Sequence, residues 1–341
     1  MPTIVKILCF HKAEKRASYR YRVAQFLPHW TNYHINVEPI CISGKQFFSI
    51  FKFLFILHKY DAVLLQRSIL PKVLIKIITR RSKVIFDFDD ALYTRESHDI
   101  NHKKELSKHT IKKLNYTLKK STLIFAGSND LVDYAKQYNS SVHLIPTAYG
   151  KQIAAPVRPI LFGEIKIGWI GNNANLSYLP IIDEATHYLQ LKYPAVTFSI
   201  MCDRPPEGLK TIWHLTEWSS AAENNWLQSI DIGIMPLSDD RWSRGKCAFK
   251  LIQYMAHGKP VVASNVGANK STVSHTINGY LAGNSEEWIS GLEQLILNRD
   301  VRINMGMESL NIFTEQFERS YIQLKMANIL HTSLQELVAP H

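Results

Sequence analysis

The sequence predicts two successive α/β domains, each built around a doubly wound parallel sheet. Its 341 residues exceed what one hydrophobic core usually supports. Short apolar runs alternate with longer amphipathic stretches, and this alternation starts again after a stretch with prolines and glycines at 149–163. The apolar runs lack polar alternation, which is typical of strands covered on both faces. Ligands of such sheets bind beyond the carboxyl ends of the strands, so we expect a binding cleft between the domains.

The expected elements follow from this reading. In the first half we predict strands at 4–9, 35–40, 62–65, 83–86, 123–126 and 143–145, and helices at 19–27, 47–58, 71–78, 104–121 and 130–137. In the second half we predict strands at 165–170, 196–201, 212–215, 232–235 and 261–263, and helices at 179–191, 248–257, 286–297 and 301–338. The expected organisation is an N-terminal domain at 1–150, a linker at 151–163, a C-terminal domain at 164–315 and a helical segment at 316–341 that packs back on the N-terminal domain.

Charge is concentrated in the first half of the chain. Residues 1–150 hold 24 Lys/Arg and 11 Asp/Glu, whereas residues 151–341 hold 16 and 18, and the whole chain carries +11. Such a basic half indicates an anionic partner, namely nucleic acid, a phosphorylated substrate or an acidic membrane surface, although it can also serve solubility alone. No RNA-recognition or zinc-finger motif is present, so we expect no nucleic-acid partner.

Four cysteines, at positions 9, 41, 202 and 247, form no CxxC pair and no cluster with metal-ligand spacing. The apolar run at 4–9 is too short for a signal sequence, and no run reaches the roughly 18–20 residues of a membrane-spanning helix. These features predict a cytoplasmic protein without a metal site.

The segment with the most candidate ligand-binding residues follows the strand at 232–235. Its loop holds Arg241, Arg244 and Lys246, and Lys250 and Gln253 lie in the helix that comes next. A helix N-terminus attracts anions, and Lys246 and Lys250 are four residues apart, so both can reach the same group. The alternative is a solvated helix face. We predict that these five side chains bind a phosphorylated ligand.

The residues after this helix carry a family resemblance. Residues 255–264 read MAHGKPVVAS and continue through Val266 and Gly267 to Asn269. The segment resembles the donor-binding region of family 4-like (group 1) glycosyltransferases, closest to a sub-group that reads G-K-x-x-F-K-L-x-[EQ]-Y-M-A. The resemblance implies the GT-B fold, two Rossmann-like domains facing across a cleft, with a nucleoside diphosphate-sugar donor on the C-terminal domain and no metal cofactor. It also implies retention, but Gly245 and Gln253 replace two family glutamates and leave inversion open.

Three further segments extend the expected site. The turn Gly171-Asn172-Asn173 lies where GT-B enzymes approach the donor phosphates. Asp89 and Asp90, in the run FDFDDAL after a strand, are the candidate catalytic residues, which would orient the acceptor hydroxyl or take its proton. The alternative is an acidic cluster paired with nearby Arg95.

Arg20 and Arg22, in the run SYRYR, resemble a basic motif of the same sub-group and are expected to bind the acceptor or a phosphate; a basic helix start on the surface is the alternative. Ser128, after the strand at 123–126, is expected to face the cleft with them.

Residues 47–57 read FFSIFKFLFIL and are flanked by lysines, which suits either a buried helix or contact with an anionic membrane. The resemblance therefore implies a glycan or lipid-linked glycan acceptor in cell-surface polysaccharide assembly, with the enzyme peripheral at the inner face of the cytoplasmic membrane. Two other hypotheses remain: a sugar-nucleotide epimerase on the same scaffold, and a non-catalytic anionic-ligand-binding protein.

Overall fold

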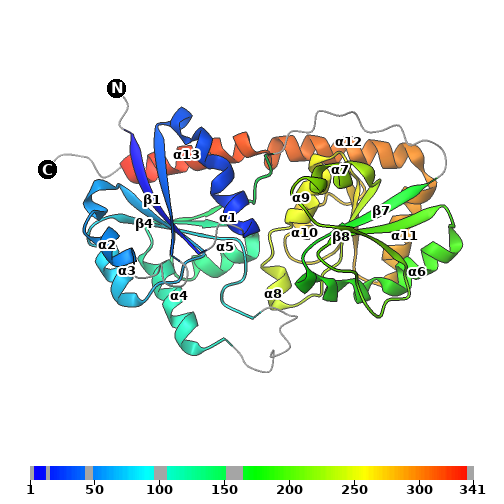
Figure 1. Ribbon diagram of the computed structural model, residues 1–341, viewed down its shortest axis with the longest axis horizontal. Coiled ribbons are helices and arrows are strands. Elements are labelled where there is room, and N and C mark those ends of the chain that lie inside the picture. The colour runs from blue at the N-terminus through cyan, green and yellow to red at the C-terminus, as the bar shows by residue number, and fades with distance from the viewer. Residues whose placement is uncertain (1–3, 13–15, 43–48, 96–105, 151–163, 336–341) are drawn as a thin grey trace.

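The computed structural model describes residues 4–12, 16–42, 49–95, 106–150 and 164–335. Two six-stranded sheets, one in each half of the chain, lie side by side (Figure 1). Helix α12 (Arg299–Gln316) runs along the C-terminal half, and helix α13 (Arg319–Gln335) continues along the N-terminal half. Every strand pair is parallel. The expectation of two doubly wound parallel α/β units is confirmed.

The N-terminal sheet has the order β2-β1-β3-β4-β5-β6. Its strands are β1 (Val5–His11), β2 (Ile35–Cys41), β3 (Ala62–Gln66), β4 (Lys83–Phe88), β5 (Leu123–Ala126) and β6 (Val142–Leu144). The helices of this half are α1 (Ala17–Arg22), the 3-10 helix η1 (Ala24–Tyr33), α2 (Ser49–Leu54), η3 (Leu57–Lys59), α3 (Lys72–Ile78), α4 (Lys108–Lys120) and α5 (Asn129–Lys136). The strands β3 and β5 are buried along their whole length because helices cover both faces of the sheet.

The C-terminal sheet has the order β12-β11-β10-β7-β8-β9. Its strands are β7 (Ile165–Ile170), β8 (Val196–Cys202), β9 (Trp213–Glu217), β10 (Ile232–Met235), β11 (Val261–Ser264) and β12 (Gly279–Ala282). Around it lie η4 (Asn173–Ile181), α6 (Asp183–Lys192), α7 (Ala222–Ser229), α8 (Arg241–Arg244), α9 (Phe249–Ala256), α10 (Asn269–Thr272), α11 (Ser285–Leu297) and α12 (Arg299–Gln316). The last helix, α13 (Arg319–Gln335), packs on the N-terminal half instead.

The expected elements differ from the structure in several details, and three of them are instructive. β12 was not expected: unlike the equally short β5, β10 and β11, it is not buried throughout, since Tyr280 and Leu281 are half-buried. The helix expected at 179–191 is split, because Pro180 has no amide hydrogen and lies in the 3-10 helix η4 before α6 begins. The helix expected at 301–338 breaks between α12 and α13 at Phe317.

The chain passes from one sheet to the other beside the fully buried Tyr149. The Tyr149 amide donates to the Phe317 carbonyl at 3.1 Å, and Tyr149 forms an isolated parallel β-bridge with Glu318. After this point α13 places Ile322, Met326 and Leu330 in the hydrophobic core of the N-terminal half. The linker expected at 151–163 lies outside the described residues, and the domain limits remain a proposal.

Candidate functional site

A cavity of about 660 Å³ opens between the two halves of the molecule. The N-terminal half contributes α1 and the loops after β3 and β4, with Ser18, Arg20, Arg67, Asp89 and Asp90 among the lining residues. The C-terminal half contributes the turn after β7, the loop after β10 and the first two turns of α9, which bring in Gly171, Asn172, Asn175, Lys246, Lys250 and Gln253. The carboxyl ends of strands from both sheets therefore meet at one cavity, as the strand pattern predicts.

Two lysines form the positive side of this cavity. Lys246 Nζ donates to Asn175 Oδ1 at 3.2 Å, and Lys250 Nζ lies 4.3 Å from the centroid of the Trp169 ring. No salt bridge holds either ammonium group in the described part of the chain. Burial, followed by the nearby charge of Lys246, holds the pKa of Lys250 well below its usual range. Together with the free amides at the start of α9, these ammonium groups make a site for an anion.

The turn after β7 is shaped by Gly171. A Cβ atom at this position would lie 2.4 Å from the Trp169 ring and 3.0 Å from Lys250 Nζ, so only glycine leaves both side chains in place. The next residue, Asn172, caps η4 by accepting from the Asn175 amide at 3.3 Å. Asn173, which was expected to meet the donor, does not line the cavity, whereas Asn175 does.

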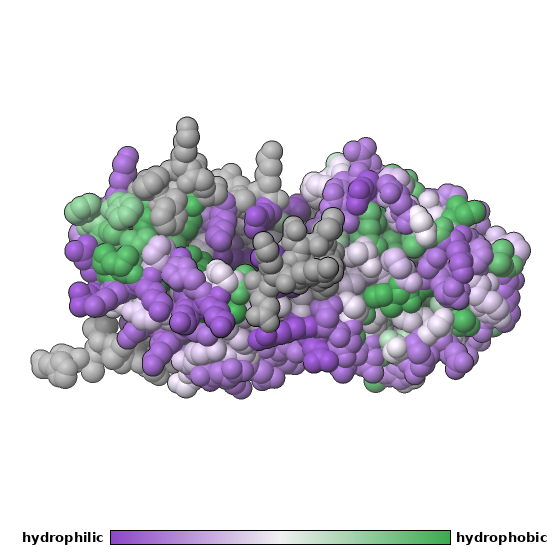
Figure 2. Space-filling model, turned by 90° about the horizontal axis from the view of Figure 1, so that it is seen from below, coloured by the Kyte–Doolittle hydropathy of each residue, from purple (hydrophilic) through white to green (hydrophobic). Residues whose placement is uncertain are grey.

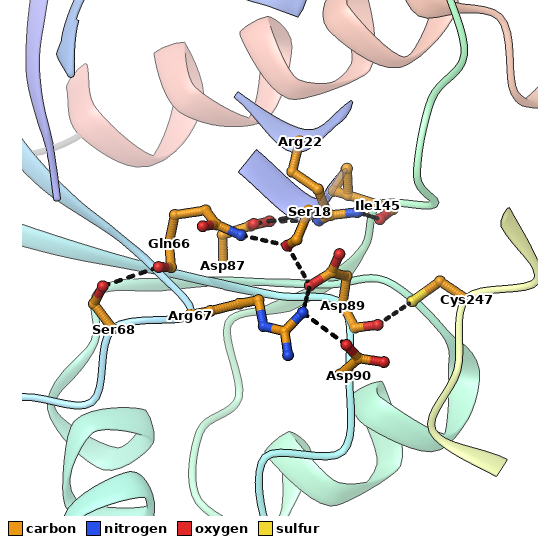
Figure 3. Close-up of polar contacts among 10 residues, drawn as sticks. All are labelled: Ser18, Arg22, Gln66, Arg67, Ser68, Asp87, Asp89, Asp90, Ile145 and Cys247. Atoms are coloured by element: carbon orange, nitrogen blue, oxygen red, sulfur yellow. Dashed lines mark hydrogen bonds and ion pairs between the residues drawn. The ribbon is translucent and has the colours of Figure 1, made fainter. Parts of the chain in front are cut away.

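The acidic loop after β4 lines the same cavity as the two lysines but belongs to the other half of the molecule. Figure 3 shows the polar contacts of this loop. Asp89 Oδ1 accepts from Ser18 Oγ at 2.7 Å, and Arg67 Nη1 lies 3.4 Å from the same oxygen. Asp90 Oδ2 lies 2.7 Å from Arg67 Nη1. Burial raises the pKa of Asp90 against the opposing charge of Arg67. Arg67, and not Arg95, is thus the cation that pairs with these aspartates among the described contacts.

Arg67 was missed at the sequence level, although it directly follows β3 at the strand's carboxyl end. Its φ angle of 48° is in the left-handed region, which is uncommon for a residue with a side chain and concentrates at functional sites. Its amide donates to the Asp87 carbonyl at 2.8 Å, so the backbone of β4 holds Arg67 beside the acidic loop. Its position directly after the buried strand β3 was the sequence signal that could have identified Arg67 as a site residue.

The structure places Arg22, which was expected to bind a phosphate or the acceptor, away from the cavity. Its guanidinium group is buried and pairs with the buried carboxylate of Asp87, with Nε 3.0 Å from both carboxylate oxygens, and Nη1 donates to the Ile145 carbonyl at 2.7 Å (Figure 3). Arg22 does not line the cavity. The pair instead ties α1 to β4 inside the N-terminal domain.

The neighbouring Arg20 does reach the cavity. Its guanidinium carbon lies 5.3 Å from the Trp218 ring of the C-terminal half, so the contact crosses the cleft. Ser128, by contrast, is 2% exposed at the start of α5 and does not line the cavity. The structure thus places Ser128 beneath the cavity surface and not at the cleft-facing position that was expected.

Two basic residues of the donor loop also lie outside the cavity. Arg244 is exposed and forms two bonds to the carboxylate of Asp239, at 2.6 and 3.0 Å. Arg241 lies over the Tyr93 ring, 5.1 Å from its centroid. Both were expected to meet the donor, but the structure places them in the short helix α8 outside the cavity, and of the basic residues of this loop Lys246 lines the cavity.

The structure gives a reason for the glycine at position 245, where the family pattern has a glutamate. A Cβ at this position would lie 2.6 Å from the Cβ of Ala91, which belongs to the N-terminal half. Nearby, Cys247 Sγ donates to the Asp89 carbonyl at 3.0 Å. The donor loop and the acidic loop are thus packed directly together, and a glutamate side chain at 245 would separate them. Gln253, at the other replaced position, lines the cavity.

Residues 164–298 match the family model described as Glycosyl transferases group 1. Residues 164–298 thus belong with the group 1, family 4-like glycosyltransferases, and the whole chain, with two Rossmann-like domains facing a cationic cavity, has the GT-B fold. The family resemblance found in the sequence is confirmed.

Individual relatives are distant. Over 154 residues, 42% of this chain, the sequence is 27% identical to TuaH of Bacillus subtilis (strain 168), which is described as a teichuronic acid biosynthesis glycosyltransferase; the match spans only 38% of TuaH. The crystal structure of Anabaena Alr3699/HepE in complex with UDP is 14% identical, with a TM-score of 0.71 over 96% of this chain and 100% of that one. A glycosyltransferase from Rickettsia africae ESF-5 is also 14% identical, with a TM-score of 0.71 over 97% and 99% of the two chains.

Proposed function

We propose that this protein transfers a sugar from a nucleoside diphosphate-sugar to a hydroxyl group of a glycan or lipid-linked glycan. One observation carries the proposal: two lysines without carboxylate partners in the described chain face two aspartates across a single cavity that joins both domains. A diphosphate leaving group needs the positive charge, and an acceptor hydroxyl needs a group that orients it or takes its proton.

In the proposed reaction the C-terminal domain holds the donor. Lys246 and Lys250 stabilise the charge that grows on the diphosphate as the bond to the anomeric carbon breaks, and Gln253 bonds a ribose hydroxyl without contributing charge. The acceptor oxygen forms the new bond to the anomeric carbon, with Asp90 or Asp89 receiving or directing the hydroxyl proton. We propose retention of configuration and no metal, since the lysines supply the charge that a metal would bring.

The relatives support finer proposals. Alr3699/HepE is bound to UDP, and a second structure of that protein holds UDP-glucose, so we propose a uridine diphosphate-sugar as the first donor to test. TuaH is described as a teichuronic acid biosynthesis glycosyltransferase, which supports an acceptor in cell-surface polysaccharide assembly. We propose that the enzyme works at the inner face of the cytoplasmic membrane. No helix in the described part of the chain is long and apolar enough to cross a membrane.

The test is to incubate the protein with UDP-sugars, with and without a membrane lipid extract, and to follow UDP release and the sugar products. Acceptor-dependent release of UDP supports transfer. Conversion of the UDP-sugar to an epimer without release would identify an epimerase instead, and binding without turnover under both conditions would indicate a non-catalytic protein.

Replacing Asp90 with asparagine is expected to lower kcat about 100-fold while leaving the Kd for UDP within about twofold, because proton transfer at this site is lost but the lysines remain. Burial raises the pKa of Asp90, so the carboxylate becomes protonated as pH falls through this raised value. Wild-type activity should therefore decline on the acidic side, and the pH–rate profile of the variant should lack this decline. The exposed Asp133, replaced in the same way, is the control and should leave the profile unchanged.

Replacing Gly245 with alanine is expected to reduce transfer about tenfold and stability by about 1–3 kcal/mol, because the added Cβ would collide with Ala91 across the cleft. UDP affinity, which depends on the lysines, should change little. Gly283 to alanine is the matched control, since its Cβ would meet only Glu287 at an ordinary 3.5 Å. Equal activity of the two variants would contradict the proposed packing of the loops.

A further inference from the structure

Helix α2 (Ser49–Leu54) presents phenylalanines to solvent. Ile50 and Leu54 are buried in the core of the N-terminal domain, whereas Phe51 is 47% exposed. Phe55, directly after the helix, is 77% exposed. No other phenylalanine in the described part of the chain is exposed. The core accounts for Ile50, Phe53 and Leu54 on one side of this segment and leaves the rings of Phe51 and Phe55 without a packing role.

The apolar surface continues onto α3. Val73 is 63% exposed, while Leu74 and Ile75 on the opposite side of the helix are buried. Arg81, just after α3, donates to the Leu54 carbonyl at 2.7 Å and holds the ends of α2 and α3 together. Figure 2 shows apolar side chains gathered at the outer end of the N-terminal half, with hydrophilic surface beside them. We call Phe51, Phe55 and Val73 the apolar patch.

The helices around the apolar patch carry only positive charge. Lys72 Nζ lies over the Tyr116 ring at 5.5 Å and so joins α3 to α4. The three helices α2, α3 and α4 contain eight lysines and no acidic residue. Lys52, Lys72 and Lys76, which border the apolar patch, are all exposed. Three exposed lysines of the basic first half, Lys52, Lys72 and Lys76, therefore lie on the same two helices as Phe51 and Val73.

We propose that the apolar patch and its lysines dock the N-terminal domain on an anionic lipid bilayer. Aromatic rings enter the boundary between headgroups and acyl chains, while lysine ammonium groups remain at the level of the anionic headgroups. Charge complementarity favours this partner, because the bordering helices have no carboxylate to pair with a mixed-charge protein surface. The inference gives a physical basis to the proposed membrane-linked acceptor and extends that function, yet vesicle binding itself requires no sugar transfer.

The experiment is flotation of the full-length protein with vesicles that contain phosphatidylglycerol or only phosphatidylcholine. Wild type should float with the anionic vesicles and stay behind with the neutral ones. Phe51→Ser/Phe55→Ser should weaken binding about tenfold or more, since two inserted rings are lost. Lys52→Gln/Lys72→Gln/Lys76→Gln should weaken it comparably and reduce its sensitivity to salt. Leu297→Ser, which removes a 62% exposed apolar side chain from the C-terminal domain, is the matched control and should float like wild type.

Absence of wild-type flotation, equal flotation with neutral vesicles, or unaltered flotation of the phenylalanine variant would each overturn the proposal. A concentration-dependent dimer that the phenylalanine variant abolishes, without vesicle binding, would identify a second copy of this chain as the occupant. UDP binding is measured on every variant. A variant that binds UDP but no longer floats separates this surface from the donor site. Failure of the protein to bind vesicles would therefore not contradict the proposed sugar transfer.

Discussion

Replacing Lys250 with alanine is expected to weaken UDP binding about 10- to 100-fold, because a charge-assisted hydrogen bond to a phosphate contributes about 1.5–3 kcal/mol. Lys246→Ala should have an effect of similar size, and the double variant should bind more weakly than either. Both side chains line the same wall of the cavity, and neither has a carboxylate partner in the described structure that would compete with a phosphate. Isothermal titration calorimetry with UDP measures the three affinities.

The same lysine predicts a dependence on pH. In the free protein the pKa of Lys250 is lowered by burial and by Lys246. A bound diphosphate favours the charged ammonium and raises this pKa, so binding takes up a proton at pH values above the pKa of the free protein. Affinity should therefore fall as pH rises through that value. Calorimetry in two buffers with different ionisation enthalpies should reveal proton uptake in wild type and not in Lys250→Ala.

Arg244 provides the control for these variants. It belongs to the same basic loop but is held by Asp239 outside the cavity, so Arg244→Ala should change UDP affinity less than about twofold. An equal loss for Arg244→Ala and Lys250→Ala would mean that general attraction to a basic loop, rather than a defined site, accounts for binding.

The second large effect is expected at Arg22. Arg22→Met should lower the free energy of unfolding by about 3–5 kcal/mol, because it leaves the buried carboxylate of Asp87 without its cation. Urea denaturation at neutral pH measures the loss. Exposed Arg204, replaced by methionine, is the control and should change stability by less than about 0.5 kcal/mol.

The loss at Arg22 should also depend on pH. In the variant, burial raises the pKa of Asp87 in the folded state above that in the unfolded state. The folded protein then binds more protons, so the stability deficit is largest at neutral pH and shrinks as pH falls through the raised pKa. Arg22→Met/Asp87→Leu, which removes both charges, should recover much of the loss. A variant with normal stability and weakened UDP affinity would instead support the phosphate-binding role that the sequence suggested for Arg22.

The sequence predicted the fold because its signals are local. Apolar runs of strand length placed eleven of the twelve strands, and the positions where these strands end placed Asp89, Gly171 and Lys246 at the carboxyl edges of the two sheets. The spacing of Lys246 and Lys250 brought both to the start of α9. The run from Met255 to Ser264 showed the resemblance to the family. These features depend on neighbours in the chain, and so the order of residues is sufficient to recognise them.

Only the tertiary structure decided which charged residues reach the cavity. Arg20 and Arg22 look equivalent in the run SYRYR, yet one side chain turns to Trp218 in the other domain and the other to Asp87, 65 residues away. Arg67 became part of the site because β3 lies next to β4, and Gly245 is excluded from carrying a side chain by Ala91 of the opposite domain. Burial and pairing between distant segments determine whether a cation is structural or available, and residue order alone does not specify those contacts.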